Sequence, residues 1–197
     1  MSRGVIVLVR HGETVWSAAG RHTSTTDLAL TETGESQAGQ LRPVLAEWDF
    51  DEVRVSPWLR AARTAELAGL SPVIVDTDLT EWDYGDYEGL TTPQIRESRP
   101  GWDLWRDGCP KGESAAQVGA RLDRLLDRVR PILTHGDAAL VAHGHSLRVC
   151  AARWVGLPPE DGSLLKLDTA TVSVLGFERE RPVLLRWNTS TGVSESR

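Results

Sequence analysis

The stretch Val5-Ile6-Val7-Leu8-Val9-Arg10-His11-Gly12-Glu13-Thr14 decides the fold of this chain. Its first five residues are aliphatic and four of them are β-branched, which predicts a strand covered on both faces of a sheet. A second apolar run, residues 138–142, ends in His143-Gly144-His145, much as the first ends in Arg10-His11-Gly12. Two buried strands that each bring a His-Gly pair to the same edge predict a site there. We expect His11 and His143 to face each other across a phosphate.

Length and charge limit the class of protein. The 197 residues fit a single α/β domain with a sizeable core. A net charge of −6 argues against nucleic-acid binding and against a basic membrane-surface protein. The beginning of the chain lacks a signal-peptide pattern and no apolar run reaches transmembrane length, so we expect a soluble, cytoplasmic protein. Cys109 and Cys150 are expected as free thiols in a reducing compartment.

Alternating strand and helix patterns predict a three-layer α/β/α sandwich with a mixed, mostly parallel central sheet. A loop is expected over residues 15–30. Further strands are expected at 53–55, 73–75, 138–142, 164–167, 171–177 and 182–187, the last two as a hairpin. Helices are expected at 31–48, from an N-cap at Ser56 to Gly69, at 146–155, and after a capping box formed by Ser114 and Gln117. The charged residues of that last helix, Arg121 included, are interpreted as a solvated face.

Residues 82–113 form a looser segment, interpreted as a small cap over the carboxyl edge of the sheet. Together with Glu81 the segment contains eight acidic and four basic residues, and it holds five of the twelve aromatic residues. A short helix is expected near 92–98. We therefore predict one domain over 1–197, with the cap as an insertion and a flexible tail over 188–197.

Four groups of polar residues lie at strand ends or helix starts: Arg10-His11, Arg60, Glu81 and His143. Such positions converge at the carboxyl edge of an open α/β sheet. Arginines bind phosphate oxygens through a planar fork of donors, and a helix beginning after His143 adds backbone N–H groups. A neutral imidazole can attack phosphorus there, while nearby cations stabilise the transition state. Glu81 is the carboxylic acid that could give a proton to the departing alkoxide.

The stretch Leu8–Thr14 resembles the signature of the histidine phosphatase (phosphoglycerate mutase-like) superfamily. Further similar motifs follow in the family's order at 56–61, 79–81, 85, 88–89, 112–114 and 141–144, spanning nearly the whole chain. The resemblance implies that His11 is the phosphorylated nucleophile, that Arg10, Arg60 and His143 form the phosphate pocket, and that Glu81 is the proton donor. It also implies that the enzyme needs neither a metal nor another cofactor.

The loop after the first strand departs from the family pattern. Ser17 stands where members often have Asn, and Ser24 stands where many mutases have Gly, whereas residues 20–27 resemble the phosphatase branch. We expect the substrate to be bound by Arg10 and Arg60 together with six further residues: Ser17, His22, Thr23, Ser24, Gly144 and His145. His22 could equally be an exposed loop residue. No ligand spacing supports a metal site at His143 and His145.

The function expected is a metal-independent acid phosphatase acting on small phosphorylated metabolites, because so acidic a cap is poorly suited to a second phosphate. One alternative is a cofactor-dependent phosphoglycerate mutase. Others are a phosphoprotein phosphatase, which would need a more open site, and a non-catalytic phosphate-binding module, which would be marked by loss of His11 or Glu81. The C-terminal hairpin offers an edge at which two copies could form a homodimer.

Overall fold

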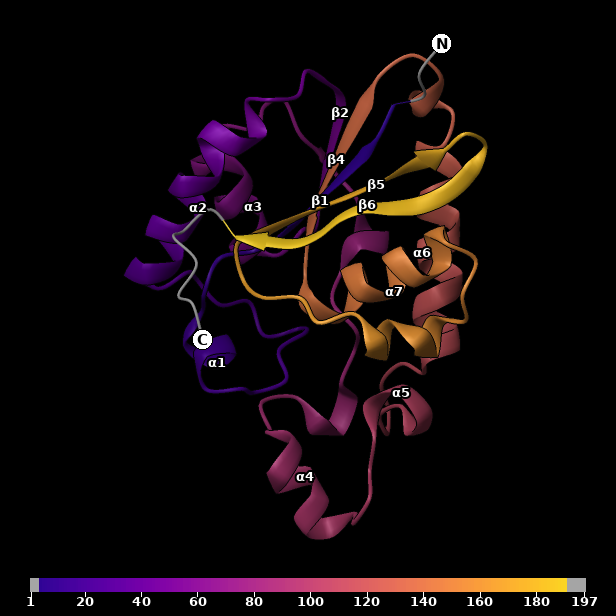
Figure 1. Ribbon diagram of the computed structural model, residues 1–197. Coiled ribbons are helices and arrows are strands. Elements are labelled where there is room, and N and C mark those ends of the chain that lie inside the picture. Colours follow the sequence, from indigo (N-terminus) through magenta and orange to yellow (C-terminus); the bar gives the residue numbers. More distant parts are fainter. Residues whose placement is uncertain (1–3, 191–197) are drawn as a thin grey trace, which may run out of the picture.

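A six-stranded sheet forms the centre of the computed structural model, which describes residues 4–190 (Figure 1). Its strands stand in the order β3-β2-β4-β1-β5-β6. They are β1 (Ile6–Arg10), β2 (Phe50–Val55), β3 (Ile74–Val75), β4 (Asp137–Ala142), β5 (Thr171–Glu178) and β6 (Arg181–Ser190). The first four strands in this order pair in parallel, and β5 and β6 add antiparallel pairings. The mixed, mostly parallel sheet is therefore confirmed, as is the C-terminal hairpin.

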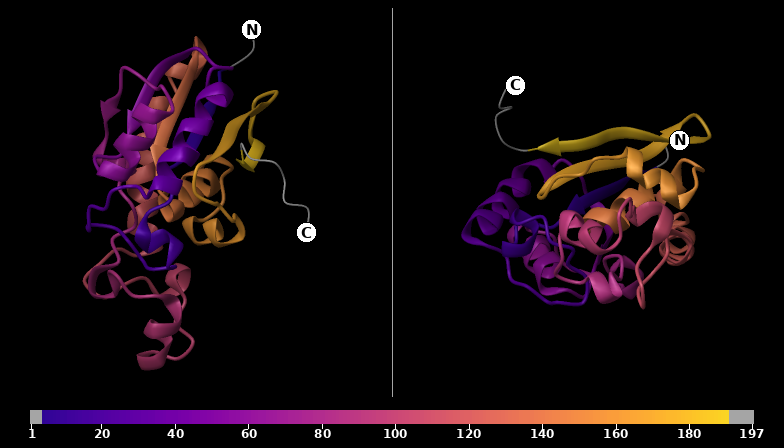
Figure 2. Two further views of the ribbon diagram at one scale, coloured as in Figure 1. Left: turned by 90° about the vertical axis from the view of Figure 1, so that its left-hand side faces the viewer. Right: turned by 90° about the horizontal axis from the view of Figure 1, so that it is seen from below.

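Helices cover both faces of the sheet, which gives three layers (Figure 2). The helices are α1 (Val15–Ala18), α2 (Glu32–Leu45), α3 (Leu59–Leu67), α4 (Thr92–Ser98), α5 (Leu104–Asp107), α6 (Ala115–Val129) and α7 (Gly144–Trp154). Ile6 and Leu8 of β1 pack on the side of α6 and α7, whereas Val7 and Val9 pack on the side of α2 and α3. This alternation explains why the whole strand is aliphatic.

The parallel pairing of β1 with β4 brings the two His-Gly sequences together. Arg10 stands opposite Ala142 in the register, so the next residues, His11 and His143, leave the sheet side by side. The backbone N–H of His11 continues the pairing with a hydrogen bond of 3.0 Å to the carbonyl of Ala142. The site is therefore placed by the register of two central strands.

The cap projects beyond the end of the sheet as α4 and α5 (Figure 1). Helix α4 has the predicted bounds and begins with a capping box of Thr91 and Gln94. The cap is joined to the loop after β1, because the N–H of His22 donates to the carbonyl of Leu90 at 2.9 Å. An isolated bridge between Arg21 and Thr91 adds to this junction.

Two predictions near the site were wrong in detail. The loop expected over 15–30 contains the short helix α1, which Thr14 and Ser17 cap reciprocally. Helix α3 has Trp58 rather than Ser56 as its N-cap, and no side chain caps it. The hydroxyl of Ser56 lies instead 2.7 Å from Nε2 of His143.

Three further predictions were wrong farther from the sheet centre. Residues 159–164 form a 3-10 helix, and the strand expected at 164–167 is absent from the described sheet. Residues 188–190 continue β6, so this part of the expected tail is strand, while 191–197 lie outside the described residues. Arg121 is buried rather than solvated. Within residues 4–190, no helix is both long and apolar enough to span a membrane.

Candidate active site

His11 stands at the end of β1 with its ring buried and in one defined tautomer. Its Nδ1 lies 2.7 Å from the carbonyl oxygen of Gly12. A carbonyl can only accept, so Nδ1 carries the proton and Nε2 keeps its lone pair. Burial holds the pKa of His11 well below its usual range, and the charges of Arg10 and Arg60 lower it further. The ring is therefore a neutral imidazole with a nucleophilic Nε2.

His143 faces His11, with 5.2 Å between the ring centroids. Nε of Arg60 donates to Nδ1 of His143 at 3.2 Å, so Nε2 carries the proton and donates to the hydroxyl of Ser56. Burial, together with the charge of Arg60, lowers the pKa of His143 well below its usual range. Two neutral imidazoles thus lie beside arginines in the buried part of the site.

Arg60 lies in the first turn of α3, as predicted, and is fully buried. Besides His143, its guanidinium donates to three backbone carbonyls of the loop after α1: those of Thr23, Ser24 and Thr26, at 3.2–3.3 Å. Arg60 therefore ties this loop to His143.

Arg10 lies against the first residue of α7. One of its Nη groups donates to the carbonyl of Leu167, while its Nε is buried without a partner among the described residues. A Cβ added at Gly144 would lie 3.3 Å from Cζ of Arg10, so the glycine leaves room for the guanidinium. A buried, unsatisfied N–H is costly unless a ligand accepts from it, and an anion at this place would do so.

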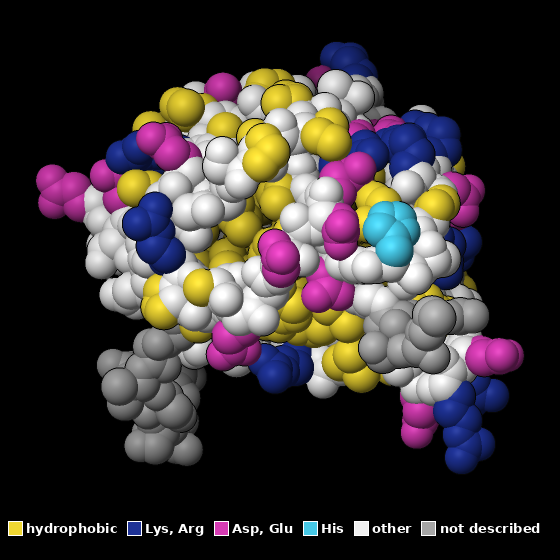
Figure 3. Space-filling view, turned by 90° about the horizontal axis from the view of Figure 1, so that it is seen from above, with side chains coloured by type: hydrophobic (Ala, Val, Ile, Leu, Met, Phe, Trp, Pro, Cys, Tyr) yellow, Lys and Arg dark blue, Asp and Glu magenta, His cyan; other side chains and the backbone are white. Residues whose placement is uncertain are grey.

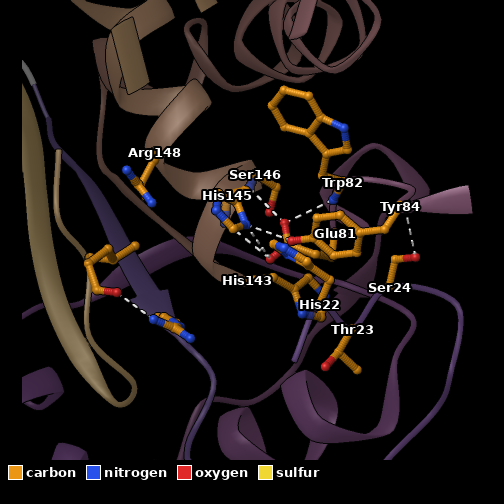
Figure 4. A network of polar contacts seen from close by, with 12 residues as sticks. His22, Thr23, Ser24, Glu81, Trp82, Tyr84, His143, His145, Ser146 and Arg148 are labelled. Carbon is orange, nitrogen blue, oxygen red and sulfur yellow. Dashed lines mark hydrogen bonds and ion pairs between the residues drawn. The ribbon is translucent and has the colours of Figure 1, made fainter. Parts of the chain in front are cut away.

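Glu81 is held by backbone N–H groups on two sides, as the close-up in Figure 4 shows. Its Oε1 accepts from the N–H of Trp82 at 2.9 Å and of Ser146 at 2.8 Å, and its Oε2 accepts from the N–H of His145 at 3.1 Å. Two of these donors belong to the N-terminal turn of α7. Oε2 has the single and longer bond, so it is the oxygen with capacity to carry a proton.

A cavity of about 180 Å³ opens between these groups. Eight of the predicted site residues line it: Arg10, His11, Ser17, His22, Thr23, Glu81, Gly144 and His145. Three do not: Arg60 and His143 are fully buried behind it, and Ser24 is turned away. The structure therefore brings the four polar groups of the sequence together at one edge of the sheet.

Ser24 is hydrogen-bonded to an acidic residue of the cap. Its backbone N–H and its hydroxyl both donate to Glu88, at 2.9 and 2.7 Å, and Glu88 also accepts from the N–H of Thr26. The hydroxyl in turn lies 3.4 Å from the backbone N–H of Tyr84. These contacts make Ser24 a junction between the loop and the cap.

His22 and His145 form the aromatic side of the cavity with Tyr84. The ring centroids of His22 and Tyr84 are 4.6 Å apart. Burial lowers the pKa of His22 to about 4 and that of His145 well below its usual range, so both are neutral. The Tyr84 hydroxyl lies 2.6 Å from Nδ1 of His145, and burial raises the pKa of Tyr84 well above its usual range. A protonated Tyr84 that donates to Nδ1 leaves Nε2 of His145 as an N–H donor.

Sequence reasoning missed several residues of this cavity. They are Thr14, Gly20, Arg21, Tyr84, Arg148 and Leu167. Arg148 lies about one helical turn after Gly144 on α7, a spacing that places both on one face and could have indicated it. Its guanidinium lies 4.5 Å from the ring of Trp105 and donates to the carbonyls of Gly162 and Ser163.

A larger cavity, about 440 Å³, lies at the opposite end of the sheet, where α2 and α3 end and β2 begins. Figure 3 views the molecule from the end at which the N-terminus lies, and it shows a hollow with hydrophobic side chains between acidic ones. The described lining has Arg42 as its single cation and no histidine. This cavity therefore lacks the groups for phosphate chemistry. In the described part of the chain, no cluster of three or more His, Cys, Asp or Glu residues could hold a metal ion.

Comparisons with known proteins agree with this geometry. The family model described as "Histidine phosphatase superfamily (branch 1)" matches residues 6–190. An acid phosphatase of Mycobacterium tuberculosis is 47% identical over 88% of this chain and 86% of its own length. A sedoheptulose 1,7-bisphosphatase of Saccharomyces cerevisiae is 39% identical over 77% of this chain and 67% of its own length. A solved structure of an open reading frame product from M. tuberculosis has a TM-score of 0.93 and 44% identity, covering 96% of this chain and 99% of that one.

Proposed function

This chain belongs to the histidine phosphatase superfamily and is a phosphatase, and we propose that it hydrolyses phosphomonoesters of small metabolites through a phosphohistidine on Nε2 of His11. The observation that carries the proposal is the tautomer of His11, whose Nδ1–H is engaged by the carbonyl of Gly12. The nitrogen with the lone pair is therefore already selected before substrate arrives.

The first step transfers the phosphoryl group to the enzyme. Nε2 of His11 forms a bond to phosphorus as the bond to the ester oxygen breaks, and the acid form of Glu81 gives its proton from Oε2 to the departing alkoxide. Arg10 offers its unpaired Nε–H to the transferred group. Donors of this kind stabilise the charge that develops on the phosphoryl oxygens.

The second step regenerates the enzyme. Water attacks the phosphohistidine, its proton passes to the carboxylate of Glu81, and inorganic phosphate leaves with His11 again neutral. Arg60, which is buried and donates to Nδ1 of His143, keeps the inner wall of the site positively charged. The whole cycle uses groups of this chain and water.

The test is the removal of the nucleophile. We expect His11→Ala to abolish hydrolysis of p-nitrophenyl phosphate and to prevent trapping of an alkali-stable phosphoenzyme from radiolabelled substrate. His135, an exposed residue outside the site, provides the matched control His135→Ala, which should behave as wild type. Activity that survives in His11→Ala would exclude the mechanism.

The cap supports hydrolysis over the mutase alternative. Its four cations are bound within the cap itself: Arg96 to the carbonyl of Trp102, Arg99 and Arg106 to Asp107, and Lys111 to Asp86. None of the four lines the 180 Å³ cavity, so none is placed there to hold a second phosphate. Interconversion of 2- and 3-phosphoglycerate should therefore be absent with added bisphosphoglycerate, and rapid turnover would favour a mutase.

The size and lining of the cavity support a small substrate over a phosphoprotein. About 180 Å³ holds a phosphoryl group and a compact organic part, which would contact the rings of His22, Tyr84 and His145. Neutral imidazoles can exchange hydrogen bonds with hydroxyl groups, and one relative in the comparison acts on a sugar bisphosphate, as its name states. A screen of phosphorylated metabolites beside a phosphopeptide would test this, and preference for the peptide would contradict it.

Location and assembly stay predictions. Free Cys109 and Cys150 are compatible with the cytoplasm. Strand β6 forms one edge of the described sheet, which supports the proposed homodimer, because an edge strand has unpaired backbone groups. Light scattering during size-exclusion chromatography would measure the mass in solution, and the mass of one chain would refute a dimer.

A further inference from the structure

We propose that Arg121, acting with Glu113, positions the proton donor Glu81 by holding the backbone on both sides of it. Arg121 does not line the cavity of the phosphate site and makes no described hydrogen bond to His11, whereas it does bond to the backbone of Glu81. The inference rests on the proposed role of Glu81 and adds a positioning residue to it.

The guanidinium of Arg121 reaches from α6 to the segment that carries Glu81. One Nη donates to the carbonyls of Asp78 and Thr80 at 2.7 and 2.8 Å, and the other donates to the carbonyl of Glu81 itself at 3.1 Å. The side chain of Arg121 is 9% exposed, so these bonds are shielded from water. A planar fork with several fixed donors suits this task better than a flexible ammonium group.

Glu113, the last residue of the cap, binds both Arg121 and the residues that follow Glu81. Its carboxylate accepts from Nε and Nη of Arg121 at 2.8 and 3.0 Å, and from the N–H of Asp83 at 2.9 Å. Its backbone carbonyl accepts from the indole N–H of Trp82 at 2.9 Å. The residues before Glu81 are thus held by Arg121, and the residues after it by Glu113.

The segment that carries Glu81 needs hydrogen-bond partners from elsewhere because it belongs to no α-helix or strand. Glu81 lies between two short 3-10 helices, η1 (Thr77–Leu79) and η2 (Gly85–Tyr87). Buried carbonyls outside helices and sheets require partners from elsewhere. The carboxyl group of Glu81 is fixed at the N-terminus of α7, so a shift of its backbone would pull Oε2 away from the leaving group.

The experiment compares two leaving groups. We expect Arg121→Lys to lower kcat/KM for an alkyl phosphate such as glycerol phosphate by about tenfold or more, a part of what general acid catalysis contributes. For p-nitrophenyl phosphate, whose leaving group needs no proton, the loss should stay below about threefold. In a Glu81→Gln background, Arg121→Lys should cause no further loss, because coupled residues are not additive.

Arg124 provides the matched control. It lies one turn farther along α6 and donates to Oδ1 of Asp78 at 2.8 Å, while its described contacts include neither Thr80 nor Glu81. Arg124→Lys should leave both values of kcat/KM unchanged. If Arg121→Lys does not fold, the charge-neutral pair Arg121→Gln with Glu113→Gln takes its place with the same expected results.

Equal losses for both substrates, or a full additional loss in the Glu81→Gln background, would overturn the positioning role. The outcome can be separated from that of the proposed function. Activity in His11→Ala would refute the phosphohistidine mechanism. An inactive His11→Ala and a leaving-group effect in Glu81→Gln, with none in Arg121→Lys, would refute this inference alone.

Discussion

Four neutral histidines, two of them buried and two half-buried, should make the stability of this enzyme depend on pH below neutrality. The pKa values of His11, His143 and His145 are held well below their usual range, and that of His22 is about 4, in each case chiefly through burial. In the unfolded chain the same rings titrate near pH 6.5. As the pH falls below this value the unfolded state gains protons that the folded state excludes, so the free energy of unfolding falls.

The magnitude follows from the number of protons excluded. Each one costs about 1.4 kcal/mol of unfolding free energy per pH unit. For His22 the loss is spread from pH 6.5 to about 4 and sums to about 3 kcal/mol. While all four rings are neutral only in the folded state, the slope approaches about 5 kcal/mol per pH unit. A domain of ordinary stability has about 5–15 kcal/mol to lose, and the four rings together remove about 5 kcal/mol of this between pH 7.0 and 5.5.

Urea unfolding at pH 7.0, 6.0 and 5.5 would measure this slope. His22→Phe keeps a flat ring against Tyr84 but excludes no proton, so its loss of unfolding free energy between pH 7.0 and 5.5 should be smaller by about 1.2 kcal/mol. His135→Asn changes an exposed residue and should leave the slope as in the wild type. An unfolding free energy that is the same at pH 7.0 and 5.5 would refute the neutral burial of these rings. The activity should not fall near pH 6.5, because His11 stays neutral and nucleophilic below that pH. A loss of activity is expected only where the protein unfolds.

Three further predictions concern the phosphate site. Gly144→Ala would place a methyl group 3.3 Å from the guanidinium carbon of Arg10. We expect inhibition by inorganic phosphate to weaken by about tenfold, a loss equivalent to one hydrogen bond to a charged group. Unchanged inhibition would show that Arg10 does not bind the anion. Glu88→Gln removes the charged acceptor of the Ser24 N–H and hydroxyl, so the melting temperature and kcat/KM should both fall, whereas wild-type values would argue against this junction. Activity should persist after dialysis against EDTA, because arginines supply the positive charge of the site, and loss that Mg²⁺ or Zn²⁺ restores would contradict the expectation.

The sequence allowed the centre of the site to be predicted because it lies on regular elements. Two aliphatic runs that each end in a His-Gly pair were interpreted as buried strands, and parallel neighbours end at the same edge. His11 and His143 were therefore expected together, and the pairing of Arg10 with Ala142 places them so. Arg60 was expected at the same edge, because it lies in the first helical turn after a predicted strand.

The contacts of irregular segments could not be predicted. Ser24 and Glu88 are 64 residues apart in the chain, and no periodicity relates a loop to a cap. Arg121 is a different case, because its spacing from Val118 and Leu125 places it on the apolar face of α6. Its charge led to the interpretation as solvated, whereas the structure buries it with an acceptor for each side of its guanidinium.

One junction, from the end of β4 into α7, supports both halves of the proposed chemistry. Residue 143 supplies the ring beside His11, residue 144 makes room for Arg10, and the N–H groups of residues 145 and 146 hold the carboxyl group of Glu81. A small movement of α7 would therefore carry the proton donor and the inner wall of the phosphate site together. His11 moves with them, because its own N–H is bonded to the carbonyl of Ala142 in the same junction. The distance between nucleophile and acid thus depends on the pairing of β1 with β4, in the most buried part of the sheet, together with the hydrogen bonds of Arg121 and Glu113 around Glu81.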